Sequence, residues 1–219
     1  MENLYQELFQ AMENAPDKFQ AMDCAAKLIS AWASESQVAD IEHFIPLFLS
    51  SELVIEKCES IDEIADRWLL MDDFDVAVLW VFYTIGLESR NIYSRMNSNG
   101  WIGKLMKSQL FPNYIVVRLL RQLIICEEMA IDDLMAVNSR FIRSILQSVI
   151  DHAYSDDLIP GQCVLLLAAL NQQFSRKPSL DSKLMALLST EEFKRREISE
   201  TIVFAFNRAS ELMLTQKTL

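Results

Sequence analysis

The sequence predicts an all-α fold, and three observations carry that prediction. Hydrophobic residues make up 51% of the 219 residues, which is enough apolar surface for a continuous core. Glycine occurs only four times and proline five times, so the residues that a β-rich fold needs for its tight turns are scarce. Apolar side chains recur at i, i+4 and i+8, as in Leu4, Leu8 and Met12, which is the stripe of an amphipathic helix.

Helix start and stop signals divide the first third of the chain. Pro16 is expected just inside the start of the second helix, where its missing N–H is not needed. Pro46 is expected to kink or break the third helix. Leu70, with its neighbours Trp68 and Leu69, is expected to pack inward. Asp72–Asp75 starts a helix, because carboxylates there cap free N–H groups, and that helix is apolar nearly all round and so central. The expected helices are 2–14, 17–34, 37–50, 52–66 and 73–88.

The rest of the chain shows the same organisation. Asn97–Gly100 is the clearest loop, and Pro112 is expected to start a strong helix. Asp132 and Asp133 mark a short turn, and Asn138 or Ser139 is expected to cap the helix that follows. The expected helices are 101–108, 112–128, 139–154, 161–174, 180–188 and 197–214.

About ten helices joined by short turns match neither a four-helix bundle nor a coiled coil with sustained heptads. A layered stack of helix pairs or triplets fits better, so the predicted fold is an armadillo- or HEAT-like helical repeat, an α-solenoid, forming one domain over 1–219. The sequence contains no strict repeat, which armadillo and HEAT units often lack. A globular helical bundle is the alternative.

Charge is unevenly distributed along the chain. The net charge is −11, but 1–75 holds 17 acidic and 4 basic residues, whereas 76–219 holds 14 acidic and 16 basic ones. No Asp or Glu occurs from Ser89 to Cys126. That stretch supplies a candidate protein-binding surface that could steer an acidic partner. Its basic residues are Arg90, Arg95, Lys104, Lys107, Arg118 and Arg121.

Aromatic residues are interleaved with these charges, at Tyr93, Trp101, Phe111 and Tyr114. Arginine and aromatic side chains together are frequent anchors of protein interfaces. The alternative is that the six charges point in different directions and form no patch. The acidic region 52–75 is either a solvated face or a second docking surface.

Composition excludes several classes of function. The acidic balance disfavours a general nucleic-acid binder, because neutralising phosphates requires positive charge. The longest apolar run, 76–86, is too short to span a bilayer, so no membrane insertion is expected. The first residues lack the basic start and apolar run of a signal peptide. The four cysteines form no C-x-x-C pair, which indicates reduced, structural thiols in a cytoplasmic protein.

No pattern indicates an enzyme, a metal site or a bound cofactor. His43 and His152 have no partners at metal-ligand spacing. Gly100 and Gly103 form only a G-x-x-G, a weak match to the nucleic-acid-clamping loops of KH domains, whose strands are missing. Paired carboxylates such as Asp156 and Asp157 fall at expected helix ends, where capping explains them. No cysteine or serine stands in a nucleophile motif.

Two segments carry a resemblance to a known family. Residues 164–174 read Val-Leu-Leu-Leu-Ala-Ala-Leu-Asn-Gln-Gln-Phe, and residues 198–208 read Ile-Ser-Glu-Thr-Ile-Val-Phe-Ala-Phe-Asn-Arg. The pair resembles the WISH/DIP/SPIN family, in which a helix ending in Leu-Asn-x-Gln-Phe precedes one ending in Phe-Asn-Arg or Leu-Asn-Arg. Asn171 and Asn207 would each end an apolar helix and bond nearby backbone groups.

The resemblance implies an armadillo-type domain that binds and activates the actin-related-protein complex without a mother filament, seeding linear actin filaments in cortical patches. Members of the family continue into further helices, so this chain is expected to be a fragment or a short member. The two motifs are expected to be core, so contact residues do not carry over from the family. The other hypothesis is a helical-repeat scaffold or adaptor for a different cytosolic assembly.

Overall fold

The fold is all-helical wherever the computed structural model describes the chain, namely residues 2–35, 38–58, 61–89, 91–126, 128–151, 159–177 and 186. Within these ranges there are twelve α-helices and no strand. The predicted all-α class is therefore confirmed for this part of the chain. The helix expected at 197–214, and all of 180–188 except residue 186, lie outside the described residues.

The chain divides into two compact units, Met1–Asn99 and Gly100–Leu219, which we call unit 1 and unit 2. Each is described by itself. A single repeat domain over the whole length stays a prediction. Unit 1 contains α1 (Glu2–Glu13), α2 (Lys18–Glu35), α3 (Val38–Leu49), α4 (Glu52–Lys57), α5 (Ile61–Leu69), α6 (Val76–Glu88) and α7 (Asn91–Ser98). Unit 2 contains α8 (Trp101–Lys107), α9 (Tyr114–Cys126), α10 (Ile131–Ala136), α11 (Ser139–Asp151) and α12 (Ile159–Ser175).

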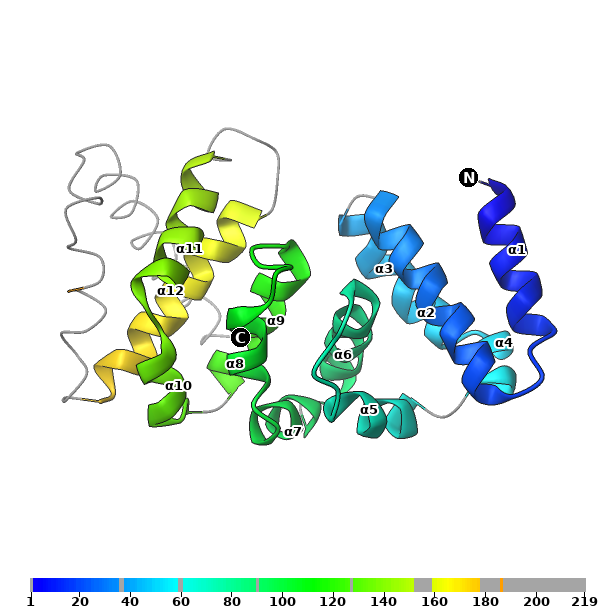
Figure 1. The fold of residues 1–219 in the computed structure, drawn as a ribbon, viewed down its shortest axis with the longest axis horizontal. Coiled ribbons are helices and arrows are strands. Elements are labelled where there is room, and N and C mark those ends of the chain that lie inside the picture. Colours follow the sequence, from blue (N-terminus) through cyan, green and yellow to red (C-terminus); the bar gives the residue numbers. More distant parts are fainter. Residues whose placement is uncertain are drawn as a thin grey trace. The chain divides into compact units, whose positions relative to one another are not determined.

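Helices α2 and α6 form the centre of unit 1 (Figure 1). Helix α2 contacts α1, α3, α4 and α6, while α6 contacts α2, α3, α5 and α7. Every residue from Ala77 to Gly86 on α6 is buried, because this helix is apolar on all sides and packs between neighbours. The sequence prediction that this helix is central is confirmed.

A cap joins the two central helices. The Val78 N–H donates to Asp75 Oδ1 at 3.1 Å, and Ser30 Oγ on α2 donates to Asp75 Oδ2 at 3.2 Å. The first bond satisfies one of the N–H groups that a helix start leaves open. Asp75 therefore starts α6, as the sequence predicted. It also fixes that start against α2, which the sequence did not predict.

Three predictions for unit 1 were wrong in detail, and of the two outcomes expected at Pro46 the break does not occur. Pro16 precedes α2, which is capped by Asp17 through the Gln20 N–H at 2.8 Å. Helix α3 continues through Pro46 without breaking. Leu70 is 74% exposed and lies just after α5, which ends at Leu69. The expected 52–66 helix is two helices, α4 and α5.

Helices α9 and α12 form the centre of unit 2, where α11 lies beside α12 and α8 beside α9 (Figure 1). Helix α9 buries eight residues, including Ile115, Leu119 and Ile124. Helix α12 also buries eight residues, the last of which is Phe174. The first motif of the family resemblance is therefore core, as expected. The second, 198–208, lies outside the described residues.

For the helix ends in unit 2, three predictions were wrong and one is confirmed. Pro112 lies in a turn after a cis peptide bond, and Asn113 caps α9 through the Ile115 N–H at 3.1 Å. Asp132 and Asp133 lie in the first turn of α10, which is a helix and not a turn. Asn138 caps α11 through the Phe141 N–H at 3.0 Å, as predicted. Asn171 does not end α12, which runs on to Ser175.

The four cysteines are free thiols, as the sequence predicted. Burial raises the pKa of the Cys58 thiol, which keeps the thiolate form rare. Among the described residues no helix is long and apolar enough to cross a membrane.

Candidate protein-binding surfaces

The six predicted basic residues do not belong to one compact unit. Arg90 lies outside the described residues. Arg95 is on α7 in unit 1, whereas Lys104 and Lys107 are on α8 and Arg118 and Arg121 are on α9, all in unit 2. The stretch from Ser89 to Cys126, which lacks acidic residues, is thus divided between two units. Only the four basic residues on α8 and α9 lie in the same unit.

Arg95 forms an ion pair with Asp66 of α5. The arginine side chain is 33% exposed and the aspartate side chain 63% exposed. Helices α5 and α7 are in contact, so this pair joins two neighbouring helices of unit 1. Such a half-exposed pair contributes little free energy, but it directs the Arg95 guanidinium toward its own unit.

Three of the four aromatic residues of the predicted surface are core residues, whereas Phe111 is half-buried. Trp101 is 0% exposed and Tyr114 5% exposed, and Tyr93 is also buried. The Lys104 ammonium lies 5.3 Å from the centre of the Trp101 ring, and the Arg118 guanidinium lies 5.6 Å from that of Tyr114. Each cation therefore covers an aromatic ring at the edge of the core. The burial of Tyr93, Trp101 and Tyr114 contradicts the prediction that these three side chains anchor an interface.

Of the four residues of the predicted basic surface that lie in unit 2, Lys107 is the most exposed. Its charge acts on Asp133, which lies on the neighbouring helix α10. Burial and the charge of Asp132 raise the pKa of Asp133, and Lys107 opposes that rise. Lys104 and Lys107 both lie in the last turn of α8, where cations also interact favourably with the helix dipole. The pair gives α8 a positive end.

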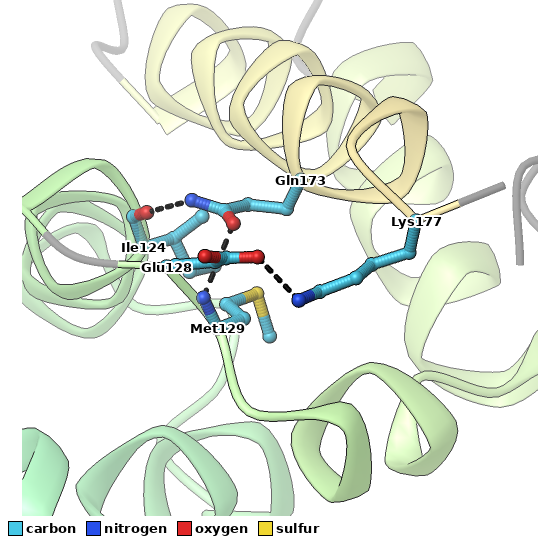
Figure 2. Close-up of polar contacts among 5 residues, drawn as sticks. All are labelled: Ile124, Glu128, Met129, Gln173 and Lys177. Atoms are coloured by element: carbon cyan, nitrogen blue, oxygen red, sulfur yellow. Dashed lines mark hydrogen bonds and ion pairs between the residues drawn. The ribbon is translucent and has the colours of Figure 1, made fainter.

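A buried glutamine that the sequence reasoning missed joins the centre of unit 2 (Figure 2). Gln173 on α12 is 3% exposed. Its Nε2 donates to the Ile124 carbonyl at 2.6 Å, and the Met129 N–H donates to its Oε1 at 3.1 Å. One side chain therefore satisfies a carbonyl at the end of α9 and an N–H in the segment leading to α10.

An ion pair lies beside the glutamine. Lys177, just after α12, pairs with Glu128, and Figure 2 shows both next to Gln173. The hydrogen bond and the charge of Lys177 lower the pKa of Glu128. The sequence signal for this cluster was a polar residue inside the apolar run 164–174, at Gln173 and not at Asn171, which is exposed.

Unit 1 contains a groove of about 600 Å³ between α2 and the segment from the end of α5 to the start of α6. We call it the α2–α6 groove. Its lining is mainly apolar and aromatic: Phe19, Met22, Ala26, Trp68, Met71, Phe74 and Val78. Four charged residues complete it: Asp23, Arg67, Asp73 and Asp75. Phe19 remains 62% exposed, with the Arg67 guanidinium 5.3 Å from its ring centre.

Among the described residues no group of three or more His, Cys, Asp or Glu side chains is arranged to hold a metal ion. His43 is an exposed residue of α3, and His152 lies outside the described residues. Comparisons with protein-family models, with curated proteins and with solved structures found no match.

Proposed function

We propose that this chain is a non-catalytic regulator that binds the actin-related-protein complex and activates it without a mother filament. In this proposal its helices form an armadillo-like array that works in the cytoplasm, at cortical actin patches. The observation that carries the proposal is the resemblance of residues 164–174 and 198–208 to the WISH/DIP/SPIN family. The chain itself would need neither nucleotide nor metal.

Packing in unit 2 supports a structural role for the first of these segments. Its apolar residues form the buried face of α12, and Gln173 bonds across to backbone groups beyond α9. A helix fixed in this way gives a rigid body. A rigid body can bias a partner between two conformations by binding one of them more tightly.

The positive end of α8 is the surface that we assign to the complex. Helix α8, which carries Lys104 and Lys107, buries three residues. Helix α9, which carries Arg118 and Arg121, buries eight. Charge reversal on α9 would therefore disturb the fold as well as an interface. Reversal on α8 tests the interface more directly.

The test is pyrene-actin assembly with the purified actin-related-protein complex, without any branching activator or preformed filaments. The chain is expected to accelerate assembly, and the double variant Lys104→Glu/Lys107→Glu to lose most of that acceleration. The control is Arg140→Glu/Arg143→Glu, which makes the same change in net charge at two exposed residues of α11 in the same unit. The control is expected to retain the acceleration.

Binding to the complex is measured in parallel by sedimentation or pull-down of purified components. Absence of both binding and acceleration would overturn the proposal. Equal loss in both double variants would refute the assignment to α8 and leave only a general effect of charge. The α2–α6 groove favours the second candidate function, an adaptor that holds another protein.

A further inference from the structure

We propose that the α2–α6 groove binds a short amphipathic segment of a partner protein, with one large apolar anchor side chain flanked by lysine or arginine. This site is independent of the actin-related-protein complex. It is a peptide-binding function of unit 1, inferred from the shape, lining and charge of the groove.

The lining has the composition of a pocket for an apolar side chain. Phe19, Trp68 and Phe74 approach the groove from α2, from α5 and from the segment before α6. Its volume, about 600 Å³, falls in the ~300–1,000 Å³ range typical of ligand sites, which are mostly apolar with a few placed polar groups. Phe19 is exposed, and Trp68 and Phe74 are half-buried. Aromatic residues around a concave surface are also typical of the buried centre of protein interfaces.

The charges around this lining select the chemistry of the occupant. Three of the four charged lining residues are acidic: Asp23, Asp73 and Asp75. The fourth, Arg67, stacks on Phe19, so its charge already has an aromatic partner. Unit 1 as a whole holds 18 acidic and 6 basic residues. A basic segment is therefore attracted, and an acidic segment or a nucleic acid is repelled.

Much of the groove is held in place before any partner arrives. Asp75 is fixed by its bonds to the Val78 N–H and the Ser30 hydroxyl. Trp68 meets the buried ring of Phe82 edge to face, at 6.5 Å between ring centres. A preformed site loses little side-chain freedom on binding. Asp73 is exposed at the rim, whereas the half-exposed Asp23 carboxylate pairs with Lys27 of the same helix at 2.7 Å.

The test uses the whole chain and fluorescent helical peptides in anisotropy titrations. Three basic peptides carry Leu, Phe or Trp as the anchor, flanked by Lys and Arg. Two controls match them, one with Glu in place of the basic residues and one with Ser in place of the anchor. At least one basic peptide is expected to bind saturably, and more weakly as salt is raised. The two control peptides are expected not to bind.

Protein variants then locate the site. Asp23→Asn/Asp73→Asn removes two rim charges, and about a tenfold loss of affinity is expected. Ala26→Leu fills the groove from α2 and is expected to weaken every peptide. The matched control is Glu52→Gln/Glu56→Gln, which removes the same charge from exposed residues of α4. It is expected to bind as the unchanged chain does.

Thermal melts of each variant separate loss of binding from loss of fold. Absence of saturable binding by all three basic peptides overturns the proposal. Equal weakening by the α4 variant and the rim variant also overturns it, since the attraction would then come from net charge and not from the groove. Because the titration contains no actin-related-protein complex, its outcome is separate from that of the assembly assay.

Discussion

Gln173 shows how one buried polar side chain can hold two helices together. It replaces the water that the Ile124 carbonyl and the Met129 N–H would otherwise bond. Buried polar groups cost most when only one partner is removed. The neighbouring motif residue Asn171, by contrast, is exposed, and its carbonyl accepts a bond from the Ser175 hydroxyl.

Gln173→Leu should therefore destabilise unit 2 strongly. The variant keeps the side-chain volume but leaves a buried N–H and a buried carbonyl without this partner, for an expected loss of about 2–4 kcal/mol. Asn171→Leu, in the same motif, should change the free energy of unfolding by less than about 0.5 kcal/mol. Urea unfolding measures both. Equal effects of the two changes would contradict the role of Gln173.

Gly86 is a second residue whose role comes from packing. The residue is buried in α6, and a methyl group there would overlap the ring of Tyr93 on α7. Tyr93 is itself buried, and its hydroxyl donates to the Tyr83 carbonyl at 3.4 Å. The ring therefore has little room to move away.

Gly86→Ala should destabilise unit 1 by about 1–3 kcal/mol, because overpacking outweighs the better helix propensity of alanine. Gly161→Ala is the control, since a methyl group at that exposed position of α12 meets nothing within 4 Å. That change should be neutral or stabilise by up to about 1 kcal/mol. Thermal or urea unfolding of both variants decides. A stabilising Gly86→Ala would contradict the close contact with Tyr93.

Residues were predictable from sequence where their partners are near in the chain. The caps Asp75 and Asn138 each accept a bond from an N–H three residues on, and both were anticipated. Gln173 bonds to groups 44 and 49 residues away, and Gly86 is constrained by the ring of Tyr93 on the next helix. No local pattern contains such contacts, so these two residues were missed.

At the scale of helices, the long elements were predicted throughout, and of the short ones the seven-residue α8 was also expected. Long amphipathic or apolar helices such as α2, α6 and α9 were expected within a few residues of their ends. Helices α7 and α10 were missed, with eight and six residues. Helices this short are not stable alone and depend on tertiary contacts. Here α7 packs on α5 and α6, and α10 packs on α8.

Helix α10 also carries a pH dependence. Burial raises the pKa of Asp133 in the folded chain, so the folded state binds more protons than the unfolded state above about pH 4. The contribution of Asp133 to stability therefore falls as pH rises toward the folded pKa and is constant above it. Asp133→Asn should remove this loss. The melting temperature of the variant should exceed that of the unchanged chain at neutral pH.

Glu128→Gln provides a comparison of opposite sign in the same unit. Lys177 lowers the pKa of Glu128, so its contribution is present above the ordinary carboxylate pKa and is lost as pH falls through the folded value. The Gln variant should melt slightly lower than the unchanged chain at neutral pH and equally at strongly acid pH. Melting temperatures measured across this pH range for both variants check the two signs. If the plots of melting temperature against pH ran parallel for the two variants, both signs would be contradicted.

At the scale of the whole molecule, the sequence shows how charge is distributed along the chain but not which residues meet in space. The acid-rich first third and the basic stretch 89–126 are real features of the chain. Their neighbours in space were not predictable, because the basic stretch is divided between two units and three of its four aromatic residues are buried in the cores. The α2–α6 groove was missed for the same reason, since residues more than 40 positions apart line it.

The position of Trp101 has an optical consequence. Trp32, Trp68 and Trp80 all belong to unit 1, whereas Trp101 is the one tryptophan that the sequence places in unit 2. Its indole is fully buried, so its emission is that of a ring shielded from water and shifts to longer wavelength when unit 2 opens. The difference between the emission of the unchanged chain and that of Trp101→Phe therefore reports on unit 2 alone. Each half of the molecule carries its own intrinsic fluorophore.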